Sequence, residues 1–373
     1  MNVLITGACG FVGRNLAKVL RRRDDIELCE FDLEFPKQQL ADGLERADVV
    51  FHLAGVNRPP TPEEYEAGNA GFTQEICDQL ISHGRTPKIV FASSTQAELD
   101  NPYGKSKLLA EQCLRRFSDA TGARVVIFRW TNLFGKWCRP NYNSVTATFC
   151  HNVAHGLPIQ ISDPNYEVEL AYIDDVVAAL LDELKDAEDR QQVVTASVQP
   201  TYRVTLGALA ATIQSFYDCR TNLLLPDMSD RFVRCLYGTY LSYLPQDQFA
   251  YSLDVKSDNR GELAEFLKSP QFGQIFVSRT KPGVTRGNHY HHTKFEKFFV
   301  VEGEGVVRFR HVESDEVLEY RVSGKNFRVV DIPPGYTHSI ENVGRGEMVV
   351  LFWASEVFDP SNTDTYFTEV RHG

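Results

Sequence analysis

A glycine-rich loop near the N-terminus constrains the fold more than any other feature of this sequence. Residues 7–13 read Gly-Ala-Cys-Gly-Phe-Val-Gly and directly follow the apolar run at residues 3–5. Glycines between a strand and a helix let the backbone approach a pyrophosphate, while the free N–H groups of the helix point at the anion. The sequence therefore predicts a dinucleotide-binding loop. Its expected cofactor contacts are Gly7, Gly10, Phe11, Val12 and Gly13.

Short apolar strands alternate with helical patterns through the first half of the chain. Strands that alternate with helices build βαβ units around a parallel sheet. We therefore expect a doubly wound, Rossmann-like α/β fold for this half. The expected strands cover residues 3–6, 26–31, 49–53, 88–92 and 124–128.

The pattern changes near residues 244–258, beyond which short alternating strands are separated by turn residues. This pattern is typical of an all-β sandwich or barrel. A chain of 373 residues also exceeds the usual size of a single core. We expect two domains, residues 1–244 and residues 245–373. The strands expected in the second cover residues 274–277, 297–301, 305–310, 327–330 and 348–352.

The bulk composition narrows the range of partners. The net charge of −11 argues against nucleic acid or an anionic membrane as the main partner. No apolar run approaches the ~20 residues that a membrane helix needs, and the N-terminus lacks the basic region of a signal peptide. None of the 8 cysteines forms a Cys-x-x-Cys pair, so we expect reduced thiols. These features favour a cytoplasmic protein that acts on a small molecule.

Two residues near the glycine loop bear on the choice of cofactor. Asp32 lies at the end of the second expected strand, where a carboxylate accepts hydrogen bonds from the adenosine ribose and repels a 2′-phosphate. Asp32 thus favours NADH. Arg14 could pair with a 2′-phosphate and would favour NADPH, although it could equally be a solvated helix charge. The sequence leaves both cofactors open.

A tyrosine and a lysine stand one helical turn apart in Tyr103-Gly-Lys-Ser-Lys107, so both project from one helix face. The positive charge of Lys107 is expected to lower the pKa of the Tyr103 phenol. The phenol can then exchange a proton with a substrate oxygen. Ser94 ends the fourth expected strand, where its hydroxyl can share the reacting oxygen.

Together with the glycine loop, these residues resemble the extended branch of the short-chain dehydrogenase/reductase family, over roughly residues 1–240. The resemblance implies that Ser94, Tyr103 and Lys107 are catalytic and that the substrate is a nucleotide-activated sugar. The span between Ser94 and Tyr103 is very short for this family, which suggests a reshaped sugar pocket. Besides Tyr103 and Lys107, the further cofactor contacts that it implies are Leu53, Ala54, Gly55 and Asn69.

Basic residues in two segments could bind the diphosphate of such a substrate. Arg58 lies in one segment, and Lys136 and Arg139 lie in the other. Guanidinium groups match the geometry of phosphate oxygens, although scattered surface charge is an equal alternative. The family resemblance adds Asn132 to these substrate contacts.

Three histidines and a glutamate in the second half have the spacing of metal ligands. His289 and His291 project from the same face of a strand, because side chains alternate with a period of two. Glu296 and His338 can reach the same face. Nitrogen and carboxylate ligands suit Zn, Fe, Mn, Ni or Cu, and we expect zinc.

This ligand pattern resembles both motifs of the cupin superfamily, a small β-barrel, over roughly residues 245–373. Cupins include dioxygenases, isomerases, epimerases and sugar-binding modules. The segment Asp258-Asn-Arg260-Gly resembles the first segment of deoxysugar epimerases of this fold, in which an arginine grips the nucleotide diphosphate. The resemblance therefore implies Arg260 as a substrate contact, and a plain turn is the alternative.

The whole chain resembles a two-domain family of capsular polysaccharide biosynthesis enzymes, CapF/WbjC. The resemblance implies that the cupin domain epimerises C3 of a UDP-2-acetamido-2,6-dideoxy-L-4-hexulose. The reductase domain would then reduce the C4 ketone with NADPH to the L-talose sugar nucleotide, on the route to UDP-N-acetyl-L-fucosamine. The stretches that carry it are residues 51–59, 100–104, 132–138, 281–283, 287–289 and 336–338.

The order of the two reactions follows from the chemistry of the ketone. A C4 ketone acidifies the C3 hydrogen, so a base can remove it and an acid can return it on the other face. A nearby metal could stabilise the resulting enolate. Reduction removes that acidity, so epimerisation comes first. A metal-bound imidazole cannot also be a free base, which leaves His292 and Tyr336 as candidates for proton transfer.

Two other functions remain open. The second domain could be only a dimerisation and sugar-binding module beside a single-function 4-ketoreductase. The first domain could be a non-catalytic nucleotide sensor, although such sensors usually lack the Tyr103 and Lys107 pair. Small cupin barrels commonly pair, so we expect a homodimer.

Overall fold

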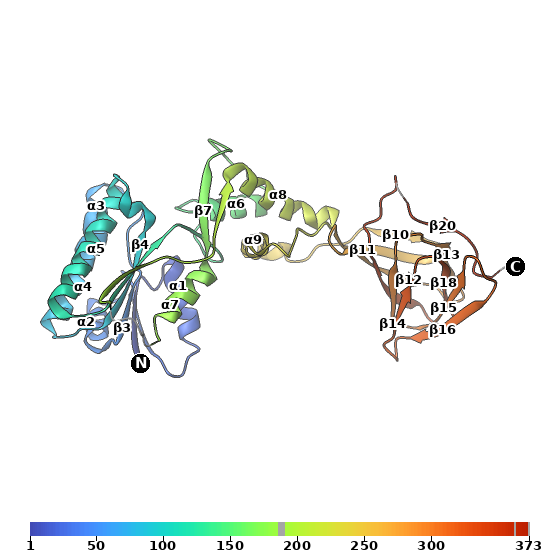
Figure 1. Cartoon of the computed structure of the whole chain (residues 1–373), viewed down its shortest axis with the longest axis horizontal. Coiled ribbons are helices and arrows are strands. Elements are labelled where there is room, and N and C mark those ends of the chain that lie inside the picture. Colours follow the sequence, from blue (N-terminus) through green and yellow to red (C-terminus); the bar gives the residue numbers. More distant parts are fainter. Residues whose placement is uncertain (186–190, 362, 372–373) are drawn as a thin grey trace. The chain divides into compact units, whose positions relative to one another are not determined.

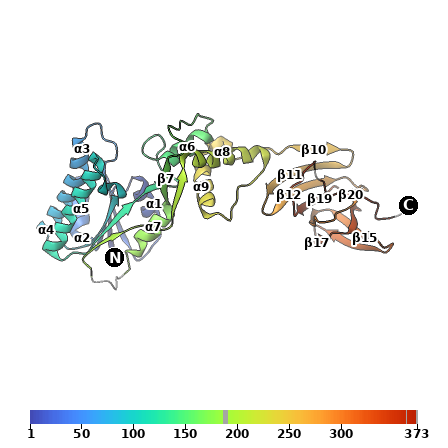
Figure 2. The same ribbon diagram turned by 45° about the horizontal axis from the view of Figure 1, so that its top comes forward.

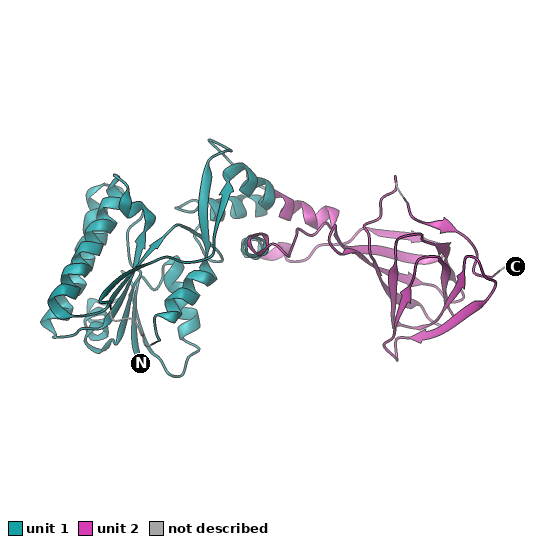
Figure 3. Ribbon diagram, in the orientation of Figure 1, with its two compact units in different colours: residues 1–213, 234–245 teal, residues 214–233, 246–373 magenta. Residues whose placement is uncertain are grey.

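The computed structural model describes residues 1–185, 191–361 and 363–371. It divides into two compact units (Figure 3). Unit 1 comprises residues 1–213 and 234–245, and unit 2 comprises residues 214–233 and 246–373.

Unit 1 is built on a parallel sheet of the order β2-β1-β3-β4-β5-β8. The chain passes from β1 to β2 on one side of β1 and then continues with β3 on its other side. The carboxyl ends of β1 and β3 therefore form a topological switch point. Parallel sheets bind ligands at such points. The strands are Asn2–Thr6 (β1), Glu27–Phe31 (β2), Val49–His52 (β3), Lys88–Ser94 (β4), Val125–Trp130 (β5) and Val193–Ala196 (β8).

Helices cover both faces of this sheet (Figure 1). Val3 and Ile5 of β1 belong to the core beneath α1 and α7, whereas Leu4 belongs to the core beneath α2, α4 and α5. Since both faces are buried, the strand reads as a continuous apolar run. The expected doubly wound α/β fold is confirmed for this unit. The helices are Phe11–Leu20 (α1), Lys37–Arg46 (α2), Glu63–Glu66 (α3), Phe72–Ser82 (α4), Pro102–Thr121 (α5) and Ile173–Asp182 (α7).

The N-terminus of α5 is fixed by local sequence. The Asn101 side chain accepts a hydrogen bond from the Gly104 N–H at 2.8 Å, and Pro102 occupies the first turn. A Cβ at Gly104 would lie 2.1 Å from the carbonyl oxygen of Gln96, so only glycine allows this close approach. Tyr103 is thereby placed in the first turn of α5.

Residues 1–248 also contain a second, small sheet and several helices that the strand pattern did not predict. Of these residues, 214–233 and 246–248 belong to unit 2. In the small sheet β6 pairs parallel to β7, which pairs antiparallel to β9. The remaining elements are Ala67–Gly71 (η1, a π-helix), Thr95–Glu98 (η2), Asn132–Phe134 (β6), Val145–Ala154 (α6), Glu167–Tyr172 (β7), Thr201–Thr205 (β9), Leu206–Asn222 (α8), Arg231–Leu241 (α9) and Gln246–Gln248 (η3).

Unit 2 contains two antiparallel sheets, of the orders β10-β11-β12-β19-β14-β17 and β16-β15-β18-β13-β20 (Figures 1 and 2). They share one apolar core, in which Phe298 and Phe352 of the first sheet pack with Phe309 and Ile340 of the second. The expected all-β second half is therefore confirmed. Its strands are Val255–Asp258 (β10), Gly261–Ser269 (β11), Gly273–Thr280 (β12), Thr285–Tyr290 (β13), Glu296–Glu302 (β14), Glu304–His311 (β15), Val317–Ser323 (β16), Val329–Ile332 (β17), Tyr336–Asn342 (β18), Met348–Ala354 (β19) and Tyr366–Phe367 (β20).

Across the part of the chain that the structure describes, every helix is too short or too polar to cross a membrane.

Candidate functional site

The glycine loop lies directly against the segment that follows β3. Gly7 has a φ of +75°, and a Cβ there would lie 2.6 Å from the Ala54 nitrogen. A Cβ at Gly13 would lie 2.1 Å from the carbonyl oxygen of Gly7. Gly10 caps α1. The loop, the N-terminus of α1 and residues 53–55 thus meet at the switch point of the sheet.

Asp32 and Arg14 occupy different surroundings at this loop. One Asp32 oxygen accepts the Cys9 N–H at 2.7 Å, and the other accepts the Leu33 N–H at 2.8 Å. The carboxylate is therefore held against the glycine loop. The Arg14 guanidinium lies 5.6 Å from the centre of the Trp137 ring.

The structure brings Ser94, Tyr103 and Lys107 together. The Ser94 hydroxyl hydrogen-bonds the Tyr103 hydroxyl. Lys107 is 4% exposed, and its Nζ donates to the Ala92 carbonyl at 2.9 Å. That Nζ also lies 6.0 Å from the centre of the Tyr103 ring. A Cβ at Gly55 would lie 2.8 Å from Lys107 Nζ, so the lysine contacts the segment that follows β3.

Asn69 holds the same segment through hydrogen bonds of its side-chain amide. Its Oδ1 accepts the Val56 N–H at 2.9 Å, and its Nδ2 donates to Ser106 Oγ at 2.9 Å. Asn69 lies in the π-helix η1, and π-helical turns are frequent at functional sites. Asn69 Oδ1 and Lys107 Nζ therefore pack together against Gly55, since a Cβ there would lie 2.8 Å from each of them.

Burial dominates the ionisation of the pair on α5. It raises the pKa of Tyr103 to about 12, although the hydrogen bond from Ser94 acts in the opposite direction. The expectation that Lys107 lowers this pKa was wrong, because burial outweighs the other effects. Burial also lowers the pKa of Lys107 to about 8, against the attraction of Glu111. At neutral pH Tyr103 is a neutral phenol that can donate a proton, beside an ammonium group.

Two tyrosines that the sequence did not single out surround Tyr103. The Tyr65 ring lies 5.9 Å from the Tyr103 ring, and its hydroxyl donates to the Asn57 carbonyl at 3.0 Å. Tyr142 also influences Tyr103 electrostatically, and the Arg139 guanidinium lies 5.2 Å from the Tyr142 ring. The signal in the sequence for such neighbours was the short span between Ser94 and Tyr103, because it suggested that the surroundings of Tyr103 differ from those in the family.

The other expected substrate contacts are less closely tied to Tyr103. Lys136 forms an ion pair with Asp174 at 2.5 Å. The Asn132 side chain donates to the Glu169 carbonyl at 3.5 Å. Arg58 is exposed on the segment after β3. Among the three basic candidates, Arg139 is the one that the described contacts link to Tyr103, because it contacts Tyr142 and Tyr142 acts on Tyr103.

The four expected metal ligands converge in unit 2. The potential ligand atoms of His289, His291, Glu296 and His338 all lie within 4.8 Å of one another. Nε2 of His291 and Nε2 of His338 are each 3.6 Å from a Glu296 oxygen. His289 and His338 are cross-strand neighbours on β13 and β18, while Glu296 begins β14 in the other sheet. The ligand group is therefore assembled from both sheets.

The donor atoms of this group fit a divalent transition metal. His291 donates its Nδ1–H to the Asp364 carbonyl, which leaves the lone pair on Nε2. Nε2 of His291 and of His338 are buried without a hydrogen-bond partner among the described residues, and such atoms are rare in folded proteins. Burial lowers the pKa of His289 to about 4. Although burial raises it, the pKa of Glu296 is lowered on balance by His291 and His338. Neutral imidazoles and a carboxylate are suitable ligands for zinc.

The two candidates for proton transfer lie at different places in unit 2. Tyr336 lies two residues before His338 on β18, so both project from the same face, and Tyr336 packs against the core. His292 is exposed, and its ring contacts Tyr290 at 5.3 Å and Tyr366 at 4.8 Å. The structure therefore does not bring His292 to the ligand group, because it lies in the loop after β13 and its ring packs on Tyr290 and Tyr366 instead.

Two arginines of unit 2 have different surroundings: Arg260 directly precedes β11, and Arg286 lies on β13. Arg260 contacts Asp258 Oδ2 through Nε at 2.9 Å and through Nη2 at 2.6 Å. Arg286 pairs across the sheet with the inward residue Ile340, and burial lowers its pKa. A one-residue bulge at Asn288 returns His289 to the same face. The sequence did not predict Arg286, because the bulge is invisible in a simple alternating pattern.

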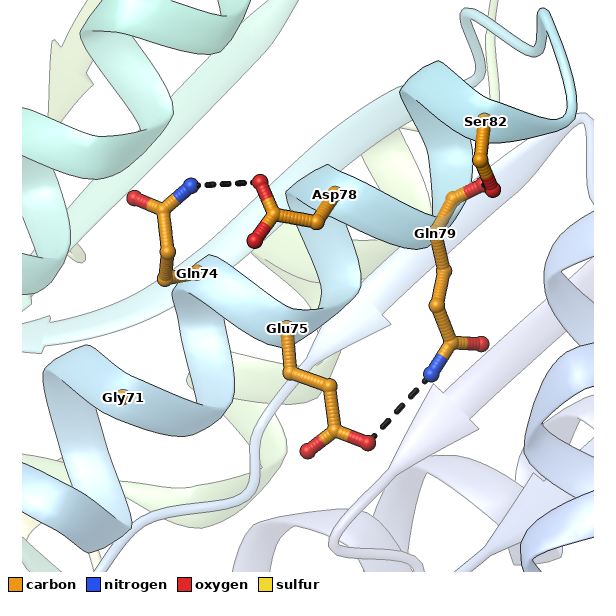
Figure 4. Close-up of a pocket in the computed structure, with 6 residues that line it drawn as sticks. All are labelled: Gly71, Gln74, Glu75, Asp78, Gln79 and Ser82. Atoms are coloured by element: carbon orange, nitrogen blue, oxygen red, sulfur yellow. Dashed lines mark hydrogen bonds between the residues drawn. The ribbon is translucent and has the colours of Figure 1, made fainter.

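A shallow surface hollow lies along α4, away from these groups (Figure 4). Its polar side chains pair along the helix, with Gln74 donating to Asp78 at 2.8 Å and Gln79 donating to Glu75 at 3.3 Å. These contacts are ordinary for a solvated helix face. The lining residues are Gly71, Gln74, Glu75, Asp78, Gln79 and Ser82.

Known families match both halves of the chain. Residues 3–198 match the NAD dependent epimerase/dehydratase family, and residues 256–366 match the polysaccharide biosynthesis C-terminal domain. The chain is 44% identical over all 373 residues, and over the full length of its relative, to UDP-2-acetamido-2,6-beta-L-arabino-hexul-4-ose reductase of Pseudomonas aeruginosa. The crystal structure of the capsular polysaccharide assembling protein CapF from Staphylococcus aureus superposes with a TM-score of 0.91 at 47% identity, covering 99% of this chain and 100% of that one. The chain belongs to the CapF family.

Membership of the CapF family makes the chain an enzyme of the NAD-dependent reductase or epimerase type. CapF with the inhibitor 3-isopropenyl-tropolone is also similar, with a TM-score of 0.87 at 43% identity over 99% of this chain and 100% of that one. UDP-glucuronic acid 4-epimerase from Bacillus cereus covers 58% of this chain and 83% of its own, with a TM-score of 0.52 at 17% identity. That last likeness concerns the fold alone.

Proposed function

We propose that this chain is a bifunctional nucleotide-sugar enzyme. Unit 2 would epimerise C3 of UDP-2-acetamido-2,6-dideoxy-L-4-hexulose, and unit 1 would then reduce the C4 ketone to give UDP-2-acetamido-2,6-dideoxy-L-talose. The observation that carries the reductase is the Ser94–Tyr103 hydroxyl pair beside the buried Lys107, in a chain 44% identical to a UDP-sugar reductase. The product would serve the synthesis of UDP-N-acetyl-L-fucosamine for a capsule or O-antigen, in the cytoplasm.

In the reductase step the residues of α5 and β4 handle the proton. A bound nicotinamide would supply a hydride to C4. Tyr103, which its raised pKa keeps protonated, gives its phenolic proton to the C4 oxygen. The Ser94 hydroxyl shares that oxygen, and the Lys107 ammonium stabilises the negative charge left on the phenol.

We expect the reductase rate to fall as the pH rises through about 8, which is the pKa to which burial lowers Lys107. Below that pH the ammonium is present. Above it the group becomes neutral, and the rate should fall about tenfold per pH unit. Tyr103, with a pKa of about 12, stays protonated near neutral pH and so causes no change in the rate there. The pH profile of kcat/KM measures this, and a profile flat through the alkaline range would remove Lys107 from the step.

In the epimerase step the ketone itself makes the C3 hydrogen acidic. Tyr336 projects from the same face of β18 as His338. In this proposal it returns a proton to C3, on the face opposite to the one from which a base has removed it. A divalent metal, expected to be zinc, would be held by the three histidines and Glu296 and would supply positive charge that polarises a carbonyl. Epimerisation precedes reduction, because the reduced sugar has no acidic C3 hydrogen.

A single-function 4-ketoreductase is the second candidate, since the name of the Pseudomonas aeruginosa relative specifies only a reductase. Incubation of the full chain with the 4-keto UDP-sugar, with and without reduced cofactor, distinguishes the two. NMR then reads the configuration at C3 and C4. Reduction without any change or deuterium exchange at C3 would favour the single function, and unit 2 would then be a sugar-binding module.

We further propose that unit 2 is a cupin barrel that pairs into a homodimer. An apolar row crosses four strands of its larger sheet, because Val277, Leu351, Phe299 and Val329 are successive cross-strand neighbours. Phe327, 77% exposed, packs its ring 5.5 Å from that of Phe299. Large exposed apolar patches mark association surfaces. Sedimentation equilibrium tests the pairing, and a monomer at micromolar concentration would reject it.

We expect NADH to be used at least as well as NADPH. Asp32 is held at the edge of the glycine loop by the Cys9 and Leu33 N–H groups, where it would repel a 2′-phosphate. Asp32→Ala should therefore shift the preference toward NADPH. Reductase rates with each cofactor measure this. A strong NADPH preference that Asp32→Ala leaves unaltered would reject the idea.

A further inference from the structure

Residues 363–371, which we call the C-terminal strap, cross the ligand group of unit 2. The Phe367 ring lies 6.1 Å from that of His289, and β20 pairs with β13. Further along, the Thr368 N–H donates to the Asn288 carbonyl at 2.9 Å. Near the end of the strap, the Glu369 carbonyl accepts a hydrogen bond at 2.8 Å from Arg310 of β15, a side chain that is 4% exposed. The strap is therefore anchored on the sheet that carries His289 and His338.

One strap residue, Asp364, organises the loop between two ligands. Its carboxylate accepts the N–H groups of His292 at 2.9 Å, Thr293 at 2.8 Å and Lys294 at 2.8 Å. The Thr293 hydroxyl adds a fourth hydrogen bond at 3.0 Å. These three residues connect His291 to Glu296, so the carboxylate fixes the conformation of the segment between those ligands.

The backbone of the same residue fixes the orientation of a ligand ring. The Asp364 carbonyl accepts the Nδ1–H of His291. A carbonyl cannot donate, so this bond selects the tautomer whose Nε2 carries a lone pair, and that Nε2 faces Glu296 at 3.6 Å. Partners of this kind, beyond the ligands themselves, set ring orientation and raise ligand basicity.

We propose that Asp364 is a positioning residue for the metal site, acting through His291 and the 292–294 segment. The proposal rests on the proposed metal in unit 2 and adds to it that the C-terminal strap sets the affinity and geometry of that metal. Asp364 is not one of the four potential ligands. Its carboxylate holds the backbone of residues 292–294, and its carbonyl holds the imidazole of His291.

The test compares Asp364→Asn with Asp359→Asn in the full chain. Asparagine keeps the size of the side chain but presents an NH₂ group where N–H donors converge. Asp359 precedes the strap, and its carboxylate accepts the Ser361 N–H at 2.8 Å, so the control makes the same chemical change away from the ligands. The zinc dissociation constant is measured by competition with a chromogenic chelator, and the cobalt-loaded protein is examined by its visible absorption spectrum at saturating cobalt.

We expect Asp364→Asn to raise the zinc dissociation constant by about 10- to 100-fold and to change the cobalt spectrum. Asp359→Asn should match the parent in both. An unchanged constant in Asp364→Asn would overturn the proposal, as would a weaker affinity with an unchanged saturated spectrum, because the strap would then only stabilise the fold. Failure of the parent to bind zinc would instead reject the metal itself. If Asp364→Asn does not fold, nitrogen NMR of the metal-free parent decides, and an Nε2–H tautomer of His291 would be incompatible with the proposal.

Discussion

Replacing Tyr103 with phenylalanine is expected to lower the rate of C4 reduction by about 100- to 10,000-fold, the usual effect of losing a general acid. The change removes only the hydroxyl that hydrogen-bonds Ser94. The glycine loop and the Gly55 segment do not depend on that hydroxyl, so cofactor binding should persist. Rapid mixing with the 4-keto UDP-sugar gives the rate, and fluorescence titration gives the affinity for the reduced cofactor.

Tyr142→Phe is the matched control, since Tyr142 also lies within electrostatic reach of Tyr103. It should leave kcat close to the parental value, because the ring that contacts Arg139 is retained. Equal losses of kcat in the two variants would contradict the assignment of Tyr103 as the proton donor. A parent chain that binds the reduced cofactor but shows no reduction would instead support a nucleotide-sensing role for this unit.

Local features of the chain were sufficient to predict the cofactor half. Gly7 and Gly13 must be glycine because backbone atoms occupy the space of a Cβ. The spacing of glycines in the loop sequence shows this requirement directly. The spacing of the four expected metal ligands also predicted that they would meet, and they do, although they come from both sheets of unit 2. Contacts within one element, or between elements of known pairing, can be deduced from sequence.

Contacts between distant segments were not predictable in this way. Tyr65 reaches Tyr103 from the short helix α3, and nothing in the spacing of the two indicates the contact. The pKa of Tyr103 was expected to fall because Lys107 is near, yet it rises because burial depends on the whole fold. His292 was a candidate by proximity in sequence, although its ring packs on Tyr290 and Tyr366 and not on the ligands. Asp364 lies too far along the chain for any motif to connect it with His291.

Glu296→Gln is expected to lower deuterium exchange at C3 by about 100-fold or more, the rate equivalent of roughly 3 kcal/mol of lost electrostatic stabilisation. The substitution keeps the shape of a side chain that lies 3.6 Å from both His291 and His338, while removing its charge. Exchange is measured by NMR in D₂O on the 4-keto UDP-sugar without any reduced cofactor, so reduction cannot contribute. Glu302→Gln, an exposed position at the other end of β14, is the matched control and should exchange at the parental rate.

The two variants together separate the two chemistries. Tyr103→Phe should retain exchange at C3 while losing reduction, because its hydroxyl lies in unit 1. Glu296→Gln should reduce the C3 epimer, when this is supplied, at the parental rate, because the donor pair on α5 and β4 is untouched. If the parent chain shows no exchange at all, unit 2 is not an epimerase and its histidine group holds a structural ion. If Glu296→Gln exchanges as fast as the parent, the acidity that the ketone confers on C3 is sufficient without the ligand group, and the catalytic role of that group fails.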